Sequence, residues 1–195
     1  MPSDPAFSAK TRLRAALRRA RRDMARAVPD AAARAAAALP LDDLPAFAVV
    51  AGYVALGGEF DPAPLLARLT AHGARLVLPA AFDRASPMTF RAADDPAAFV
   101  PDVFGIPSPP PGAEALTPDL IIAPVLAFDR FGGRLGQGAG CYDRTLAVLR
   151  AAGSPWVIGL AYAGQEMDRV PVDPHDQALD AILTESGYSV LRKDI

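Results

Sequence analysis

Residues 119–146 read DLIIAPVLAFDRFGGRLGQGAGCYDRTL, and this stretch decides the fold class. It opens on a short, strongly apolar run at 120–123, which predicts a buried strand. It closes on the start of a segment from Cys141 to about Ala152 that we expect to be helical. A loop with five glycines joins the two. A strand that leads through a loop into a helix is the repeating unit of folds with a parallel sheet.

The alternation of strand and helix continues on both sides of this stretch. We expect helices at 8–27 (with Ser8 as the cap), after Pro29 and Asp30, and at 61–72. We expect strands at 47–54, 75–78 (ended by Pro79), 88–91, 156–160, 181–184 and 188–191. The proline-rich segment 93–118 predicts an irregular surface excursion, and whether it acts as a lid stays open. The sequence therefore predicts an α/β fold: a single layered domain over residues 1–195, with a mostly parallel sheet flanked by helices.

The bulk composition is that of an ordinary globular protein. Hydrophobic residues make up 51% of the 195 residues and charged residues 22%. No run of about 18 consecutive apolar residues occurs, so we expect no membrane span. The single cysteine, Cys141, excludes an internal disulfide and favours a reducing compartment. We therefore expect a cytoplasmic protein.

The charge is distributed unevenly. Residues 1–26 carry eight basic and two acidic residues (+6), whereas the whole chain has a net charge of −2 and the remainder is therefore −8. On a helix, Lys10, Arg14 and Arg21 share a strip beside an apolar stripe, and Arg12 and Arg19 fall on the far side. Such a basic helix meets an anionic ligand, meets its own acidic body, or is solvated. The acidic remainder argues against a nucleic-acid partner.

The glycine loop is the strongest candidate for a functional site. Glycine backbones approach an anion closely, and the N-terminus of the following helix adds partial positive charge. Arg134 supplies a planar cation, and Asp143 in the first helical turn is placed to hold Mg²⁺ bound to phosphate. The loop lacks the lysine of a Walker A motif and the third glycine of the dinucleotide fingerprint. Glycine richness alone is equally typical of a tight strand-to-helix turn without a ligand, but Arg134, Asp143 and the position at the carboxyl end of a strand favour phosphate binding.

The loop also carries a resemblance to a known family. The pattern F-D-x-x-G-x-R-L-G-x-G-x-G-x-Y-D-R at 128–144 is very similar to the signature of the 5-formyltetrahydrofolate cyclo-ligase family, also called methenyltetrahydrofolate synthetases. Further landmarks follow in the family's order along nearly the whole chain: Lys10 with Arg14, Tyr53, Gly58-Glu59, Leu78-Pro79, Met88 with Phe90, 104–106, 159–162, Gln165, Val170-Pro171, His175-Asp176, Asp180 and Thr184-Glu185.

The resemblance implies a reaction and its small-molecule partners. Family members use ATP and Mg²⁺ to phosphorylate the N5-formyl oxygen of 5-formyltetrahydrofolate. N10 then closes the ring, and 5,10-methenyltetrahydrofolate, ADP and phosphate are released. The resemblance thus implies a ligase with a folate substrate, no membrane partner and a monomeric state.

The resemblance also assigns site residues. Lys10 and Arg134 match groups that act on the transferred phosphate, and Asp143 and Asp176 match the magnesium ligands. The ATP contacts match Lys10, Thr11, Arg12, Leu13, Arg14, Arg134, Leu135, Gly136, Gln137, Gly138, Ala139, Gly140, Cys141 and Tyr142. The folate contacts match Val54, Glu59, Gln137, Gly138, Ala139, Gly140 and Cys141.

Three loop residues depart from the common family pattern G-Y-G-G-G-Y-Y-D. Gln137 and Cys141 replace tyrosines, and Ala139 replaces a glycine. The loss of aromatic residues is the feature that favours the main alternative, a non-catalytic relative that binds folate or nucleotide. Against this alternative stand the charged residues that the chain retains: Lys10, Arg14, Arg134, Asp143 and Asp176. A different phosphotransferase could also use the same loop, and the basic helix could bind RNA. A helix N-terminus lowers the pKa of a thiol, but we expect Cys141 to be a packing residue rather than a nucleophile.

Overall fold

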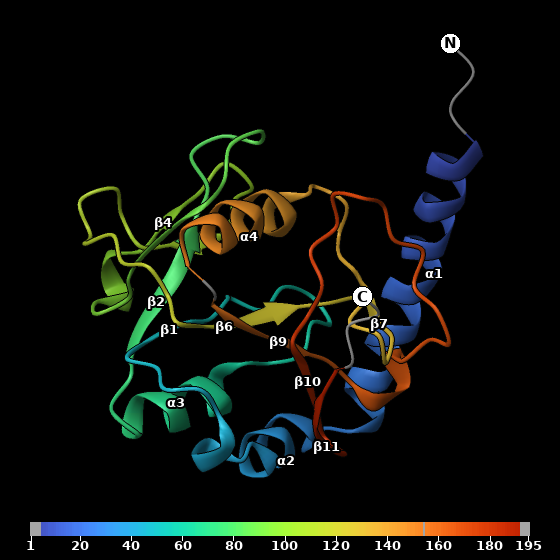
Figure 1. Cartoon of the computed structure of the whole chain (residues 1–195), viewed down its shortest axis with the longest axis horizontal. Coiled ribbons are helices and arrows are strands. Elements are labelled where there is room, and N and C mark those ends of the chain that lie inside the picture. The colour runs from blue at the N-terminus through green and yellow to red at the C-terminus, as the bar shows by residue number, and fades with distance from the viewer. Residues whose placement is uncertain (1–4, 154, 192–195) are drawn as a thin grey trace.

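A seven-stranded sheet forms the centre of the computed structural model, which describes residues 5–153 and 155–191 (Figure 1). The strand order is β11-β10-β9-β6-β1-β2-β3. The strands are β1 (Val49–Ala51), β2 (Arg75–Ala80), β3 (Thr89–Ala92), β6 (Leu120–Pro124), β9 (Trp156–Leu160), β10 (Ala181–Thr184) and β11 (Gly187–Val190). The five central strands are parallel, and the edge strands β3 and β11 pair antiparallel. The predicted fold class is therefore confirmed.

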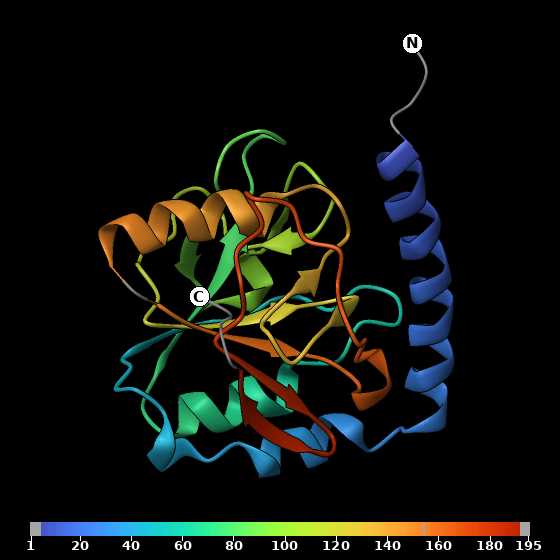
Figure 2. The ribbon, with the colours of Figure 1, turned by 45° about the vertical axis from the view of Figure 1, so that its right-hand side comes forward.

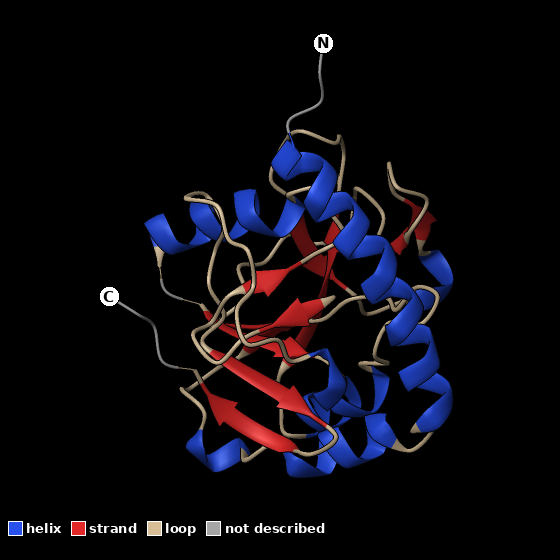
Figure 3. Ribbon diagram, turned by 90° about the vertical axis from the view of Figure 1, so that its right-hand side faces the viewer, coloured by secondary structure: helices blue, strands red, loops and turns tan. Residues whose placement is uncertain are grey.

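Helices cover both faces of this sheet. Helices α2 (Ala31–Ala38) and α3 (Ala63–Ala71) lie on one face, and α4 (Cys141–Ala152) lies on the other (Figures 1 and 2). The long α1 (Pro5–Ala27) stands beside the sheet rather than on a face (Figure 3). Short elements complete the chain: β4 (Val100–Pro101), β5 (Pro107–Ser108), β7 (Ala127–Phe128), β8 (Arg134–Leu135) and the 3-10 turns η1 (Leu41–Asp43), η2 (Pro96–Ala98) and η3 (Ala163–Gln165).

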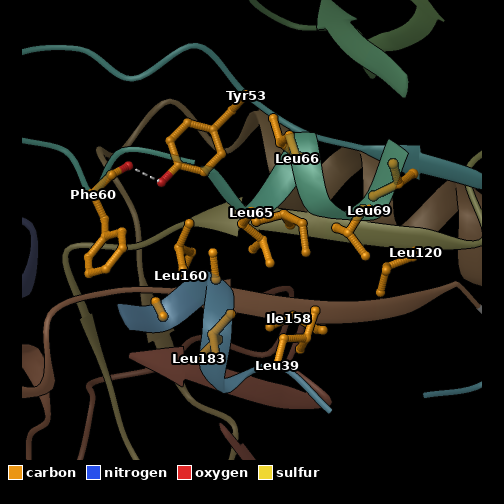
Figure 4. Close-up of a cluster of buried hydrophobic side chains, with 14 of the residues drawn as sticks. Leu39, Tyr53, Phe60, Leu65, Leu66, Leu69, Leu120, Ile158, Leu160 and Leu183 are labelled. Carbon is orange, nitrogen blue, oxygen red and sulfur yellow. Dashed lines mark hydrogen bonds between the residues drawn. The ribbon is translucent and has the colours of Figure 1, made fainter. Parts of the chain in front are cut away.

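Alternation along β6 divides the core between the two faces. Leu120 and Ile122 join the cluster under α2 and α3, whereas Ile121 and Ala123 join the cluster under α4. Figure 4 shows the first cluster, which contains leucines of α3 together with Ile158 of β9 and Leu183 of β10. Because both faces are covered, the strand reads as one continuous apolar run, which is the pattern by which the sequence identifies it.

The connections create a switch point in the sheet. From β1 the chain passes through α3 to β2 on one side, and the next parallel strand, β6, returns to the other side of β1. The following crossover, from β6 through α4 to β9, continues away from β1. In open sheets of this type, ligands bind outside the carboxyl ends of the strands at the switch point. The loops after β1 and β6 are therefore the expected walls of a site.

Helix α1 packs on these same loops. Its Leu13 and Leu17 pack on a cluster that contains Ala127, Leu135 and Val170. The turn after β1 lies so close to the helix that a Cβ on Gly58 would come within 3.0 Å of the Arg22 backbone. The basic helix therefore crosses the carboxyl ends of the strands. Among the helices in the described part of the chain, none has the length and apolar character that crossing a bilayer requires.

Several element boundaries differ from those predicted. Helix α1 begins by Pro5, so Ser8 lies inside the helix and is not its cap. Strand β1 begins only at Val49, where the Asp119 carboxylate accepts the N–H groups of Ala48 and Val49 at 2.9 Å each, and it ends at Ala51 rather than at 54. Pro79 does not end β2, because at this position only β3 pairs with the strand and a missing N–H is tolerated. The segment 93–118 contains a short β4–β5 hairpin rather than only irregular loop.

Candidate active site

Three basic side chains of α1 contact the loops at the carboxyl end of the sheet. Lys10 Nζ lies 2.6 Å from Asp173 Oδ2 and 3.8 Å from Asp176 Oδ2. Arg14 Nε donates to the carbonyl of Gly136 at 3.1 Å. Arg18 donates to both the side-chain oxygen and the backbone carbonyl of Gln137, at 2.8 and 3.1 Å. The strip of positive charge therefore faces the body of the protein, as the helical spacing of Lys10 and Arg14 predicts.

A buried aspartate holds the start of the glycine loop through backbone hydrogen bonds. The carboxylate of Asp129 is 1% exposed and accepts the N–H groups of Phe131, Gly133 and Val170. Further along the loop, Gly138 and Gly140 have φ values of 106° and 69°, a backbone conformation that residues other than glycine rarely adopt. No described residue other than glycine has a positive φ, so the methyl group of Ala139 causes no backbone strain.

Arg134 is buried at the centre of the loop. It is 6% exposed, and its guanidinium lies 2.5 Å from Asp143 Oδ1 and donates to the carbonyl of Gln177. The same Asp143 oxygen accepts the N–H of Gln177 at 2.9 Å. Burial lowers the pKa of Arg134, and the carboxylate of Asp143 opposes this shift. Asp143 therefore ties the first turn of α4 to Arg134 and to the loop that contains Asp176.

A pair of carboxylates fits a magnesium ion that is also bound to phosphate. Asp143 and Asp176 come from different elements, and Asp176 directly precedes the Gln177 that bonds Asp143. Within the described ranges no group of three or more metal-binding side chains is close enough to form an all-protein cage. Mg²⁺ commonly binds through one or two carboxylates and keeps water and phosphate oxygens as its other ligands. A cavity of about 510 Å³ adjoins this group and is lined partly by Arg134, Asp173 and Asp176.

A second, more buried group lies around Glu59 in the loop after β1. The Glu59 side chain is 9% exposed, and its Oε1 atom lies 3.6 Å from Arg21 and accepts Gln137 Nε2 at 3.0 Å. The Tyr142 hydroxyl is buried and has no hydrogen-bond partner among the described residues. Burial raises the pKa of Tyr142, and the charge of Glu59 adds to this shift. The two loops at the switch point therefore meet through Glu59 and Gln137.

The thiol of the first residue of α4 is half-buried. Burial raises the pKa of Cys141, although Arg144 partly opposes this shift, so the direction is opposite to that expected at a helix N-terminus. The role of Cys141 as a packing residue rather than a nucleophile stays a prediction. The remaining predicted contact residues differ in exposure. Thr11 and Arg12 are exposed, and Val54, after β1, is half-buried. Leu13 packs on the cluster that contains Leu135.

The structure adds four residues that the sequence did not single out as site residues. They are Arg18, Arg21, Asp129 and Asp173. A signal existed for Asp129, because an aspartate before a glycine turn commonly accepts the following N–H groups. The contacts of the other three depend on segments that are distant in sequence; Lys10 and Asp173, for example, are 163 residues apart.

Comparison with known proteins agrees with this geometry. The sequence model of the 5-formyltetrahydrofolate cyclo-ligase family matches residues 6–185. A 5-formyltetrahydrofolate cyclo-ligase of Mycolicibacterium smegmatis is 37% identical over 191 residues, covering 94% of this chain and 97% of the relative. The Escherichia coli K12 cyclo-ligase is 32% identical over 142 residues, covering 70% of this chain and 78% of the relative.

Solved structures share this fold. The 5,10-methenyltetrahydrofolate synthetase of Aquifex aeolicus superposes with a TM-score of 0.72 at 27% identity, over 95% of this chain and 94% of that one. The Mycoplasma pneumoniae synthetase, at 22% identity and a TM-score of 0.70, covers 90% of this chain and 98% of its own and confirms the fold. The resemblance found in the sequence is thereby confirmed. The chain belongs to the 5-formyltetrahydrofolate cyclo-ligase family.

Proposed function

We propose that this enzyme converts 5-formyltetrahydrofolate to 5,10-methenyltetrahydrofolate and consumes one ATP in each cycle. Membership of the cyclo-ligase family supports the reaction. One structural observation carries the assignment of the site. Lys10, Arg14 and Arg134, from distant parts of the chain, lie at the glycine loop together with Asp143 and Asp176. This group combines the cations, backbone donors and carboxylates that phosphoryl transfer requires.

The chemistry needs an activated formyl oxygen. The γ-phosphoryl group of ATP is transferred to the N5-formyl oxygen, and ADP is released from it. N10 then attacks the formyl carbon and loses its proton as the new C–N bond forms. The C–O bond breaks, and phosphate leaves with the former formyl oxygen. The protein contributes by aligning the two substrates and by neutralising charge, rather than by forming a covalent bond to either.

The ATP polyphosphate binds against the glycine loop in this proposal. The contacts come from residues 10–14 of α1 and from 134–142, the loop together with the start of α4. Three cations of this group, Lys10, Arg14 and Arg134, are at present held by carboxylates or a carbonyl. Phosphate oxygens replace the carbonyl of Gly136 as the partner of Arg14 when ATP binds, because an ionised acceptor forms the stronger hydrogen bond with a cation. Lys10 and Arg134 pass from carboxylate to phosphate oxygens when Asp176 and Asp143 bind Mg²⁺ instead.

Asp143 and Asp176 hold Mg²⁺ in this proposal, and they become available when phosphate takes over Arg134 and Lys10. When bound, the metal neutralises charge that develops on the transferred phosphate. The pairs Arg134–Asp143 and Lys10–Asp176 therefore keep the site compact before ATP arrives.

The folate binds on the other side of the loop in this proposal, against Val54, Glu59 and residues 137–141. The Glu59 carboxylate accepts hydrogen bonds from the N–H groups of the pterin ring. The hydroxyl of Tyr142 is buried and has no hydrogen-bond partner among the described residues. Of the charged groups that shift its pKa, Glu59 has the largest effect. Because Gln137 contacts Glu59, one loop borders both substrates.

The direct test follows formation of the 5,10-methenyl chromophore with purified protein. We expect absorbance in the near ultraviolet to rise only when 5-formyltetrahydrofolate, ATP and Mg²⁺ are all present. Removing the metal with a chelator is expected to stop the rise, and adding excess Mg²⁺ is expected to restore it. Folate binding without chromophore formation would instead support a non-catalytic, ligand-sequestering relative.

A further inference from the structure

Arg21 and Glu59 form a buried ion pair that the assigned site does not explain. Arg21 is 5% exposed although it belongs to a helix whose other arginines are mostly exposed or half-buried. Its NH1 atom lies 3.6 Å from Glu59 Oε1. Burial lowers the pKa of Arg21, and Glu59 is the largest influence opposing the shift. Removing two charges from water costs free energy, which the ion pair and its further hydrogen bonds must offset.

Two glycines before Glu59 allow the turn after β1 to lie directly against α1. Gly57 has a φ of 59° and allows a tight turn, in which the N–H of Glu59 donates to the carbonyl of Leu56 at 3.1 Å. Gly58 lets this turn lie directly on α1, because a Cβ there would come within 2.9 Å of Arg22 Cγ. The turn therefore directs the side chain of Glu59 toward Arg21.

Glu59 keeps unused hydrogen-bonding capacity. Its Oε1 accepts Gln137 Nε2 at 3.0 Å, and its Oε2 accepts the N–H of Leu56 at 3.0 Å. An ionised carboxylate has about four acceptor positions, so Glu59 is held by two bonds and one ion pair while other positions remain. The Nε atom of Arg21 and the hydroxyl of Tyr142 are also buried and lack partners among the described residues.

We infer that Arg21 is a positioning residue of the folate site, which holds the Glu59 carboxylate in the orientation that accepts the N–H groups of the substrate. This inference rests on the proposed function, since it assigns Glu59 to the folate. A purely structural ion pair would need its polar atoms satisfied within the protein, whereas this group leaves an acceptor position of Glu59, a guanidinium nitrogen of Arg21 and the hydroxyl of Tyr142 without partners among the described residues. The ligand class that fits is a heterocycle with adjacent N–H donors and a carbonyl acceptor, such as an aminopyrimidinone.

The test measures binding of 5-formyltetrahydrofolate by calorimetry without ATP, together with the KM for each substrate. We expect Arg21→Met to raise the folate Kd and KM about tenfold, as expected for losing support of a charged hydrogen-bond acceptor. The KM for ATP is expected to stay within about twofold, and Arg21→Lys is expected to recover most of the folate affinity. Arg19→Met, an exposed arginine on the same helix, is the control and leaves both constants unchanged.

A double variant tests whether Arg21 acts through Glu59. If Arg21→Met fails to fold, Arg21→Lys is measured in its place, and a folate Kd far above that of the parent in a folded Arg21→Lys protein would overturn the inference. In the Glu59→Gln background, adding Arg21→Met is expected to cause no further loss of folate affinity, because the carboxylate that Arg21 positions is already gone. A further loss would overturn the inference, and so would an unchanged folate Kd in a folded Arg21→Met protein. Equal increases in the KM for folate and ATP would also overturn it.

The calorimetric readout separates this inference from the proposed reaction. Folate binding that depends on Arg21, without chromophore formation by the parent protein, would keep the positioning role and refute the cyclo-ligase activity. A parent protein that does not bind 5-formyltetrahydrofolate would refute both.

Discussion

Two helices follow neighbouring parallel strands of the same sheet, and they begin in different ways. Helix α3, after β1, is entered through Asp61 and Pro62; Asp61 Oδ1 accepts the N–H of Ala63 at 2.9 Å, and proline occupies the first turn. Helix α4, after β6, is entered through Gly140 at a φ of 69°, a residue with no side chain to cap the helix. One N-terminus satisfies its backbone donors locally, and the other relies on its surroundings.

We propose that the first crossover is structural and the second catalytic. At α3 the N–H of Ala63 is bonded to Asp61 and Pro64 has no N–H, so fewer donors remain for a ligand. At α4 the first turn carries Asp143, which contacts Arg134, and the preceding loop places glycine backbone beside the cations of α1. A ligand phosphate therefore fits the second arrangement better than the first. The predictions below test this contrast.

The largest expected effect is on catalysis, at Asp143. Asp143→Asn keeps an oxygen for the N–H of Gln177 but removes the charge that pairs with Arg134 and that we propose binds Mg²⁺. We expect kcat to fall by about 10²-fold or more, as found when one preorganised electrostatic group is lost. The measurement is the initial rate of chromophore formation at saturating ATP.

The matched control for that variant lies at the other helix. Asp61→Asn preserves a capping oxygen at α3 and is expected to leave kcat and both KM values unchanged. If Asp143→Asn were as active as Asp61→Asn, the catalytic role of the α4 N-terminus would be lost.

The next effect concerns the backbone of the glycine loop. Gly140→Ala forces a Cβ into a left-handed conformation and within 2.7 Å of Arg144 NH1. We expect a loss of about 1–2 kcal/mol in the free energy of unfolding from the conformation alone. Denaturant titration measures this loss, and a rise in the KM for ATP is expected to accompany it. Unchanged stability would mean that the left-handed turn is not needed.

A smaller effect is expected when the cap of α3 is removed. Asp61→Ala deletes the acceptor for Ala63 and is expected to cost about 1 kcal/mol of stability. The proposed site does not include this end of the helix, so kcat per folded molecule is expected to stay the same. A selective loss of activity at full stability would contradict the contrast between the helices.

The smallest effect concerns the thiol at the start of α4. Burial raises the pKa of Cys141, so the thiol remains protonated at a pH where a free thiol has begun to ionise. We expect iodoacetamide to modify Cys141 several-fold more slowly than glutathione at pH 8, with the rate rising only at higher pH. Faster modification than glutathione would show that the helix N-terminus dominates after all.

Local patterns in the sequence predict much of this architecture. The bounds of α4 are predicted to the residue, because a glycine cluster ends where a helical pattern begins. Strands β6 and β9 are predicted from continuous apolar runs that both faces of the sheet bury. The end of β2 is missed because the tolerance of Pro79 depends on which side of the strand is paired, and that is a tertiary property.

The site is predicted less completely, for the same reason. Arg134 and Asp143 are found as phosphate and metal candidates, but their buried pairing is visible only in the fold. The pair Arg21–Glu59 joins a helix to a turn in a different part of the chain, and no local spacing marks it. Helical spacing places Arg21 on the inner strip, yet it does not say which carboxylate the side chain meets.

The most direct test of the proposed chemistry follows one oxygen atom. The substrate is 5-formyltetrahydrofolate labelled with ¹⁸O in the formyl group, incubated with ATP, Mg²⁺ and the purified protein. Transfer of the phosphoryl group to the formyl oxygen predicts that each phosphate released carries the label, with one labelled phosphate for each 5,10-methenyl product formed. Unlabelled phosphate accompanying the same amount of product would contradict the account, because the formyl oxygen would then have left without being phosphorylated.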